Sequence, residues 1–243
     1  MKFQKEFDRA LAVHRQGKLR EAFHRYDAIL QSDARHAPAL HYSGVVLHQA
    51  GQHAAAADRI RAALAIDDTS ADAWSNLALA LEAAGRPAAA IDALKEALRR
   101  APRAAEFAAN LAAVQMSQGL LADAEASARQ ATTADPRHPN AWYHLALALE
   151  RQDRILEALD AAGRACGLMP GDVSYAGLKA QLELAIGAPE RARATLEAAL
   201  ARSGMDKVQL DGMARTVRFA ADGVELSFGA VGKAWALDRV AAS

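Results

Sequence analysis

The chain repeats itself every 34 residues over most of its 243-residue length. Six windows of this length begin at Phe3, Ala37, Ala71, Ala105, Pro139 and Val173. The twentieth position of every window is alanine, and the eighth is alanine or, once, glycine. A unit of this size cannot bury its own apolar face. The period therefore predicts a stack of similar units, each packed on its neighbours.

Each window holds two stretches with the apolar spacing of an α-helix. The fifteenth position is glycine in five windows and Asp153 in the other. Glycine reaches the left-handed conformation at low cost, so we expect it to end the first helix. Proline at the thirty-second position of three windows is expected to stop the second helix. The invariant alanines are expected where two helices cross closely, because a longer side chain there would push the backbones apart.

Tryptophan at the fourth position and leucine at the seventh complete a pattern that resembles the tetratricopeptide repeat. The residues are Trp74, Trp142, Leu77, Leu111 and Leu145. The resemblance implies an all-α fold, a solenoid in which about six helix-turn-helix repeats form a right-handed superhelix. The expected repeats are 3–36, 37–70, 71–104, 105–138, 139–172 and 173–204, and 205–243 is expected to cap the array. In the sixth repeat, Lys179 and Glu183 replace apolar residues, which we interpret as the wetter outer face of a terminal unit.

The tail after Gly204 breaks the period and is open to two interpretations. Residues 206–221 could form one solvated capping helix. Alternatively, apolar residues alternate with polar ones on both sides of Asp222-Gly223, which is typical of a β-hairpin. We favour a helix over about 206–214, a hairpin over 216–229 and a short helix around 231–240. The tail is interpreted as a cap, with the start of a further domain or a docking segment as the alternative.

Composition excludes several partners. Lys plus Arg and Asp plus Glu number 29 each, so the excess basic charge that nucleic acid or an anionic membrane requires is absent from the sequence. No run is apolar enough to span a bilayer, and the charged start MKFQKEFDRA does not read as a signal peptide. Cys166 is the only cysteine and fits a reducing compartment. We expect a cytoplasmic protein.

No catalytic motif is found, so we expect a protein that is not an enzyme and has no cofactor. Eight histidines are present, but no two stand four apart on one helix and no cysteine or carboxylate completes a metal-ligand spacing, so no metal site is expected. Cys166 stands where most other repeats have leucine, so it is interpreted as a small core residue rather than a nucleophile.

The family resemblance implies that the first helix of each repeat lines the concave groove of the superhelix. Our candidate partner-binding residues there are Tyr42, Asn76, Asn110, Tyr143 and His144, followed by His41 and His48. Asn76 and Asn110 occupy the same position in successive repeats, and an amide can pair with the backbone of any extended peptide. A similar ladder lines the repeat arm of O-linked N-acetylglucosamine transferases, whose bacterial members the stretch NLALALEAAGR resembles. The alternative is that both asparagines only cap or solvate a helix.

Three functions follow. The leading one is a non-enzymatic scaffold that binds an extended peptide or a helix of another protein in the groove. The second is the substrate-recruiting arm of a glycosyltransferase-type enzyme whose catalytic part lies on another polypeptide or has been lost. The third is self-association through the tail or the outer face. Histidines in the groove would make binding depend on pH if they gain charge near pH 6.5.

Overall fold

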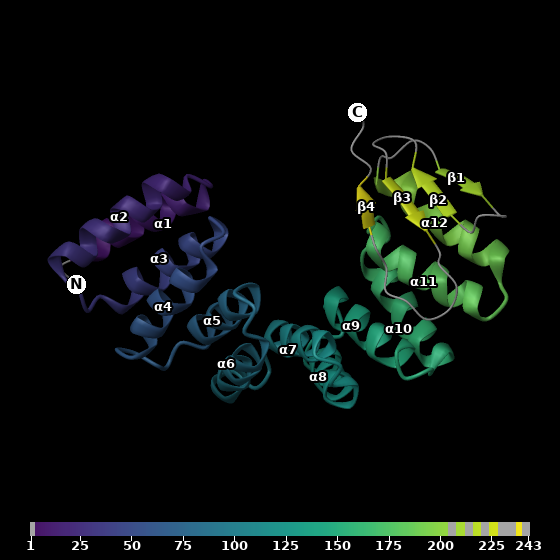
Figure 1. Cartoon of the computed structure of the whole chain (residues 1–243), viewed down its shortest axis with the longest axis horizontal. Coiled ribbons are helices and arrows are strands. Elements are labelled where there is room, and N and C mark those ends of the chain that lie inside the picture. Colours follow the sequence, from purple (N-terminus) through teal and green to yellow (C-terminus); the bar gives the residue numbers. More distant parts are fainter. Residues whose placement is uncertain (1–2, 204–207, 212–215, 220–223, 228–236, 240–243) are drawn as a thin grey trace. The chain divides into compact units, whose positions relative to one another are not determined.

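The computed structural model describes residues 3–203, 208–211, 216–219, 224–227 and 237–239 of the chain. Twelve α-helices occupy the first of these ranges and follow one another along the sequence (Figure 1). This is the all-α repeat solenoid that the 34-residue period predicts. The helices belong to two compact units, Met1–Leu120 and Leu121–Ser243, and the boundary falls inside the fourth expected repeat.

Unit 1 holds seven of these helices and unit 2 holds the other five. Those of unit 1 are α1 (Gln4–Arg15), α2 (Leu19–Ser32), α3 (Ala37–Gln49), α4 (His53–Leu64), α5 (Ala71–Ala83), α6 (Pro87–Arg100) and α7 (Ala105–Ser117). Those of unit 2 are α8 (Leu121–Ala134), α9 (Pro139–Glu150), α10 (Ile155–Leu168), α11 (Val173–Ala185) and α12 (Pro189–Ser203). Within each unit, every helix packs against the next one in the sequence.

The turns between paired helices follow the expectation from glycine. At the fifteenth repeat position the backbone is left-handed, with φ between 72° and 79° at five glycines, and Asp153 adopts a φ of 61° in the remaining repeat. The prolines act as expected too, since α6, α8 and α10 each end two residues before Pro102, Pro136 and Pro170. Both predicted stop signals are confirmed.

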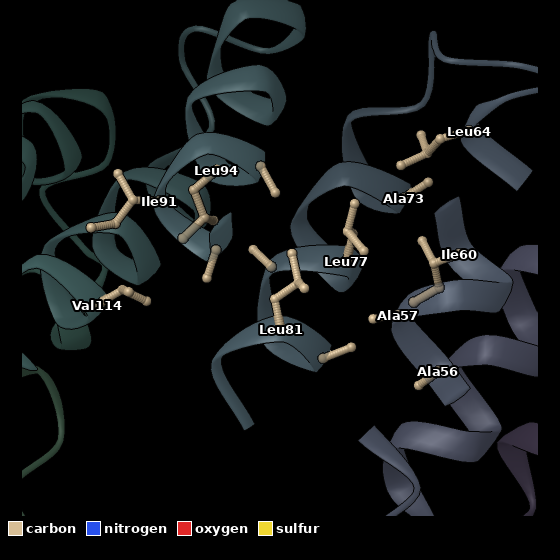
Figure 2. Close-up of a cluster of buried hydrophobic side chains, with 14 of the residues drawn as sticks. Ala56, Ala57, Ile60, Leu64, Ala73, Leu77, Leu81, Ile91, Leu94 and Val114 are labelled. Atoms are coloured by element: carbon tan, nitrogen blue, oxygen red, sulfur yellow. The ribbon is translucent and has the colours of Figure 1, made fainter. Parts of the chain in front are cut away.

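The invariant alanines lie in the core. All six at the twentieth position are between 0 and 3% exposed. Figure 2 shows Ile60, Leu77 and Leu94 of α4, α5 and α6 in one buried cluster with Ala56, which is one of these six alanines. Gly44 shows how tight the crossing of α3 and α4 is, because a Cβ atom there would lie 2.6 Å from Cγ1 of Ile60. The prediction of closely crossing helices is confirmed.

The tryptophan at the fourth repeat position ties each of its helices to the preceding turn. Nε1 of Trp74 donates a hydrogen bond to the carbonyl oxygen of Asp68 at 2.9 Å, and Trp142 makes the same bond to Pro136. An arginine guanidinium covers each ring, Arg100 at 4.9 Å and Arg164 at 4.7 Å. These tryptophans are therefore structural residues of the repeat.

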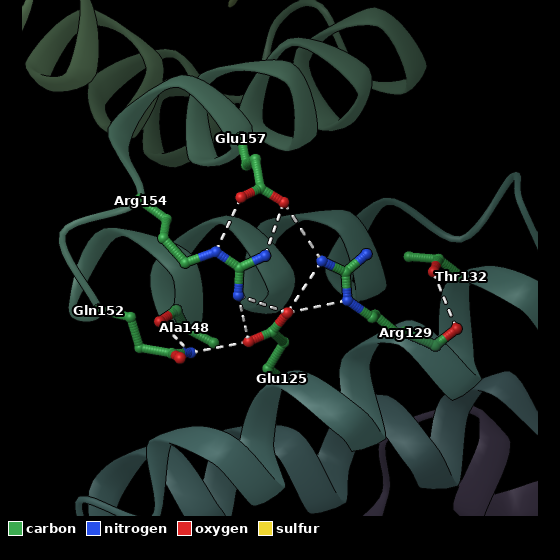
Figure 3. A network of polar contacts seen from close by, with 7 residues as sticks. All are labelled: Glu125, Arg129, Thr132, Ala148, Gln152, Arg154 and Glu157. Atoms are coloured by element: carbon green, nitrogen blue, oxygen red, sulfur yellow. Dashed lines mark hydrogen bonds and ion pairs between the residues drawn. The ribbon is translucent and has the colours of Figure 1, made fainter.

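A polar network links α8 to α10 in unit 2 (Figure 3). The side chain of Glu125 is only 15% exposed and accepts hydrogen bonds from Arg154 at 2.7 and 2.8 Å and from Gln152 at 3.0 Å. Arg129 binds the same carboxylate, and Arg154 also binds Glu157. The network fixes the start of α10 against α8.

The interpretation of Glu183 as part of the solvent-exposed outer face of the last repeat is wrong. Glu183 is 1% exposed and lies between α11 and α12, where it accepts a hydrogen bond from Oγ1 of Thr195 at 2.8 Å and pairs with Lys179 at 3.3 Å. The residue is tolerated in the core because its charge is paired and hydrogen-bonded.

The tail holds four short strands, β1 (Val208–Asp211), β2 (Thr216–Phe219), β3 (Val224–Ser227) and β4 (Leu237–Arg239). They form one antiparallel sheet in sequence order, with Val217 opposite Leu226 in the pair β2–β3. Strands β2 and β3 fall within the expected hairpin. The helices expected over about 206–214 and around 231–240 are wrong where the structure describes these segments, because β1 and β4 pair with the hairpin instead. The rest of the tail lies outside the described residues.

Candidate functional site

Helix α5, the first helix of the third repeat, presents one stripe to water. Along α5 this stripe passes through Asp72, Asn76, Leu79 and Glu82, whereas Leu77 and its neighbours on the opposite side are buried. The same repeat positions reach the surface on α3 and α1, and these helices contact one another in the order α1, α3, α5. We call these residues the first-helix face. It consists of Gln4, Asp8, Leu11, His14 and Arg15 on α1, Pro38, Tyr42, Val45, His48 and Gln49 on α3, and Asp72, Asn76, Leu79, Glu82 and Ala83 on α5.

Contacts 35 residues apart join successive first helices. The rings of Phe7 and Tyr42 lie 5.6 Å apart. Nε2 of His14 lies 2.9 Å from Oε1 of Gln49, and Nδ2 of Asn76 lies 2.9 Å from Nε2 of His41. One residue of each pair stands one repeat position later than its partner, so the helices are offset by one residue where they meet. Part of the face is thus used to hold the repeats together.

Asn76 is held by its neighbour in the preceding repeat. The amide nitrogen Nδ2 of Asn76 lies 2.9 Å from Nε2 of His41, within hydrogen-bond distance. Asn76 lies inside α5, whose N-cap is Ser70, so the alternative that this asparagine caps a helix is wrong. Asn76 remains half-buried on the surface, and Asn110 is half-buried inside α7.

Tyr42 belongs to an aromatic cluster at the start of unit 1. Its ring lies 4.8 Å from that of His41 and stacks on Tyr26 at 6.2 Å. Tyr26 is fully buried, and this burial raises the pKa of its hydroxyl to about 12. The cluster holds the half-buried Tyr42 in a fixed orientation at the surface.

The candidates of unit 2 form a separate group. The Tyr143 ring lies 5.2 Å from that of Tyr175 and 5.5 Å from that of His144. The hydroxyl of Tyr175 donates a hydrogen bond to Oδ1 of Asn140 on the previous first helix. The structure therefore brings together His41, Tyr42 and Asn76 in one unit, and Tyr143 with His144 in the other.

The histidines of both groups are neutral near pH 7. Burial, with a smaller effect of nearby His138, lowers the pKa of His144 to about 4. Burial also lowers the pKa of His41 and of His48, and His53 lowers that of His48 further. All three side chains therefore gain charge below pH 6.5, because the folded chain withholds water from the charged form, and for His144 the expected titration near pH 6.5 is displaced to about pH 4.

His48 and His41 are less available to a partner than the sequence indicates. Nδ1 of His48 lies 3.2 Å from Nδ1 of His53, and His41 is only 7% exposed. The repeat alignment missed the contact between His41 and Asn76 because it compares equivalent positions, whereas these two side chains meet one position out of register. The sequence does carry a signal for such contacts: an aromatic or polar residue stands at position five of one repeat and another at position six of the next, as in Phe7 and Tyr42.

Within the described part of the chain, no three or more histidine, cysteine, aspartate or glutamate side chains are placed to hold a metal ion. Burial raises the pKa of the Cys166 thiol to about 11, so this cysteine is a protonated thiol at neutral pH. Among the described residues, no helix has both the length and the apolar character needed to cross a membrane.

Comparison with known proteins identifies the repeat. The family model of the tetratricopeptide repeat matches residues 7–71, 65–105, 75–137 and 110–173. No curated protein matches the chain.

Three solved structures show the same fold. The first is MamA, at 23% identity over 65% of this chain and 93% of that one, with a TM-score of 0.61. The second is YrrB, described as a TPR protein with an unusual peptide-binding site, at 22% identity over 68% and 85% of the two chains, with a TM-score of 0.59. The third is PilW, described as a widely conserved type IV pilus biogenesis factor, at 19% identity over 83% and 94%, with a TM-score of 0.74.

Proposed function

The chain belongs to the tetratricopeptide-repeat family, and from this premise we propose that it is a non-enzymatic scaffold that binds a peptide or helix of another protein along its first helices. The observation that carries the proposal is the first-helix face of unit 1. Tyr42 and Asn76 are fixed there by the neighbouring repeat, yet both remain half-exposed. Side chains that are already ordered lose little entropy when a partner binds.

Each of the two groups of candidate residues supplies its own proposed contacts within its unit. Asn76 and Asn110 offer amides to a peptide backbone, since each has both donors and an acceptor. Tyr42 and Tyr143 offer aromatic surface with a polar hydroxyl, a combination enriched in protein interfaces. His144, His41 and His48 contribute as neutral, partly buried rings.

Cys166 is the only cysteine, which supports the proposal that the protein works in the reducing cytoplasm.

The test begins with affinity capture of partners and ends with a binding titration of the captured protein. The double variant Asn76→Ala/Asn110→Ala and the variant Tyr42→Ala are expected to weaken binding about tenfold or more, which corresponds to the loss of one or two good contacts. Gln31→Ala removes an amide from the exposed face of α2 and is the matched control. Unchanged affinity in both the asparagine double variant and Tyr42→Ala, with the fold intact by circular dichroism, would refute the proposal.

A second candidate function is the recruiting arm of a glycosyltransferase-type enzyme whose catalytic part lies on another polypeptide. The repeated asparagine at position six, seen in Asn76 and Asn110, is the feature that favours it. Co-purification with a sugar-nucleotide enzyme would support this candidate, and its absence from the captured proteins would count against it. Self-association is a third candidate, which a single monomeric species in sedimentation velocity would dismiss.

A further inference from the structure

Basic residues are unevenly distributed over the helices of unit 1, although the whole chain has no net charge. Among its first helices, α1 carries Lys5, Arg9 and Arg15. Helices α3, α5 and α7 contain no lysine or arginine. The second helices α2, α4 and α6 carry all of the following: Arg20, Arg25, Arg59, Arg61, Lys95, Arg99 and Arg100. The first-helix face carries three carboxylates, those of Asp8, Asp72 and Glu82, and one guanidinium, that of Arg15. The surface we assign to the partner is thus acidic.

Glu82 is an acidic residue of this face for which the described part of the chain provides no hydrogen-bond donor or cation. It is half-buried on α5, and burial raises the pKa of its carboxyl. Among the described residues, no side chain forms an ion pair or hydrogen bond with it. A partly desolvated carboxylate without a donor is unfavourable, so a cation or donor brought by a ligand would be bound with a gain in free energy.

The equivalent glutamate of another repeat shows what is absent. Glu150 stands at the same repeat position in α9 and accepts a hydrogen bond from Nε2 of Gln181, 31 residues later, at 2.6 Å. The residue 31 positions after Glu82 is Ala113, which has no donor. The repeat that follows Glu82 therefore lacks the side chain that satisfies Glu150.

The surroundings of Glu82 fit a side chain that is apolar along its length and cationic at its end. Leu79 stands one turn before it on the same helix, and Val45 and Leu11 are half-exposed at the same position on α3 and α1. Lysine and arginine lay their alkyl stems on apolar surface while the charged head reaches a polar group. An acidic segment would instead meet Asp8, Asp72 and Glu82 with like charge.

We propose that the first-helix face of unit 1 binds a segment of a partner protein that places a lysine or arginine on Glu82 with its alkyl stem over Leu79. This inference rests on the proposed function and names the chemistry of the partner.

The experiment uses the full chain and three short peptide libraries. The libraries are randomised over uncharged residues and differ only at a central position, which is lysine or arginine, glutamine, or glutamate. We expect the basic library to bind about tenfold more tightly than the glutamine library, as a charge-assisted contact to a half-buried carboxylate allows. We expect the glutamate library to bind least. Raising the salt concentration from about 50 mM to about 500 mM should reduce the preference, since the contact is partly exposed.

The variant Glu82→Gln should lose the preference for the basic library and keep its affinity for the glutamine library. Asp92→Asn, which removes an exposed carboxylate from α6, is the matched control and should behave as the wild type. Equal binding of the basic and glutamine libraries to the wild type would overturn the inference and leave the proposed function standing. So would a basic preference that survives in Glu82→Gln, or one that does not respond to salt. Absence of binding by all three libraries would overturn both.

Discussion

Alanine at repeat position twenty is small because the backbone of the partner helix leaves no room for more. Ala56 on α4 is fully buried beside Gly44 of α3, where even a methyl group added to the glycine would clash with Ile60. The requirement is steric rather than hydrophobic, since valine or leucine would bury more apolar surface. The alanines at this position of the other repeats are equally buried, at 0 to 3% exposed, as expected if the same restriction keeps the position invariant within this chain.

The variant Ala56→Val is expected to lower the free energy of unfolding by about 1–3 kcal/mol, because the added methyl groups overpack the helix crossing. Ala62→Val places the same side chain on the exposed side of α4 and should cost no more than about 0.7 kcal/mol, through helix propensity alone. Urea denaturation of both variants measures the difference. Equal losses would show that propensity, and not packing, fixes this alanine.

Gly187 tests the turn that separates α11 from α12. Its φ is +74° and a Cβ atom would meet nothing within 4 Å. Gly187→Ala should therefore destabilise the chain by about 1 kcal/mol through backbone strain alone. Gly163 lies inside α10 with equally open surroundings, so Gly163→Ala should stabilise by about 0.5–1 kcal/mol. Thermal or urea unfolding should therefore show that glycine-to-alanine lowers the stability at Gly187 and raises it at Gly163. A loss of stability in both variants would contradict this expectation.

His144 makes stability, rather than binding, depend on pH. Its pKa is about 4 in the folded chain and about 6.5 in the unfolded chain, so below pH 6.5 the unfolded state takes up the proton first. The contribution of neutral His144 to the free energy of unfolding should be complete above pH 6.5. It should fall by up to ~1.4 kcal/mol per pH unit as the pH decreases toward 4. Urea titrations of the wild type and His144→Gln measure the slope, which should be shallower in the variant. An identical slope would show that other groups cause it.

At the scale of the element, ion pairs differ in value according to how far they are withdrawn from water. The pair Arg164–Asp160 lies along the exposed side of α10 and contributes little. The network around Glu125 joins two helices and is half-buried (Figure 3). Burial alone would raise the pKa of Glu125, but hydrogen bonds from Arg154, Arg129 and Gln152 bring it below its ordinary value.

Glu125→Gln should reduce the free energy of unfolding by about 1.5–3 kcal/mol, because it removes the charge that accepts these bonds. Glu157→Gln, on a side chain that is 54% exposed, is the matched control and should cost less than about 1 kcal/mol. Urea unfolding of both variants at low and high salt separates the contribution of the half-buried Glu125 from that of the exposed Glu157. If both variants lost the same free energy, the network would be no more than a set of surface pairs.

The helices and turns could be predicted from the sequence because each depends on residues close together in the chain. Gly85 ends one helix and Pro102 follows the end of the next, wherever the rest of the chain lies. The surroundings of Asn76 and Glu183 could not be predicted, because they depend on side chains from a neighbouring helix. The tail was predicted only in part, since β1 and β4 are strands only by pairing with the hairpin.

At the scale of the whole molecule, repeats that contact only their neighbours make stability nearly local. In unit 1, every strong helix contact joins elements that follow one another in the sequence or belong to adjacent repeats. A globular protein of this length would instead connect residues from distant parts of the chain in one core. A disturbance in one repeat should accordingly weaken the adjoining helices far more than remote ones.

Ala192→Val places the overpacking substitution at the buried crossing of α11 and α12, where Ala192 is 3% exposed. Amide hydrogen exchange across the whole chain should accelerate most in α11 and α12, because the destabilisation is carried mainly by nearest-neighbour contacts. Protection in α4 and α5 should remain close to that of the wild type. Ala56→Val is the reciprocal control and should loosen α3 and α4 while α12 keeps its protection. An equal increase in every helix for either variant would mean that the chain unfolds as one cooperative unit, and that the repeat period determines its shape without determining how its stability is distributed.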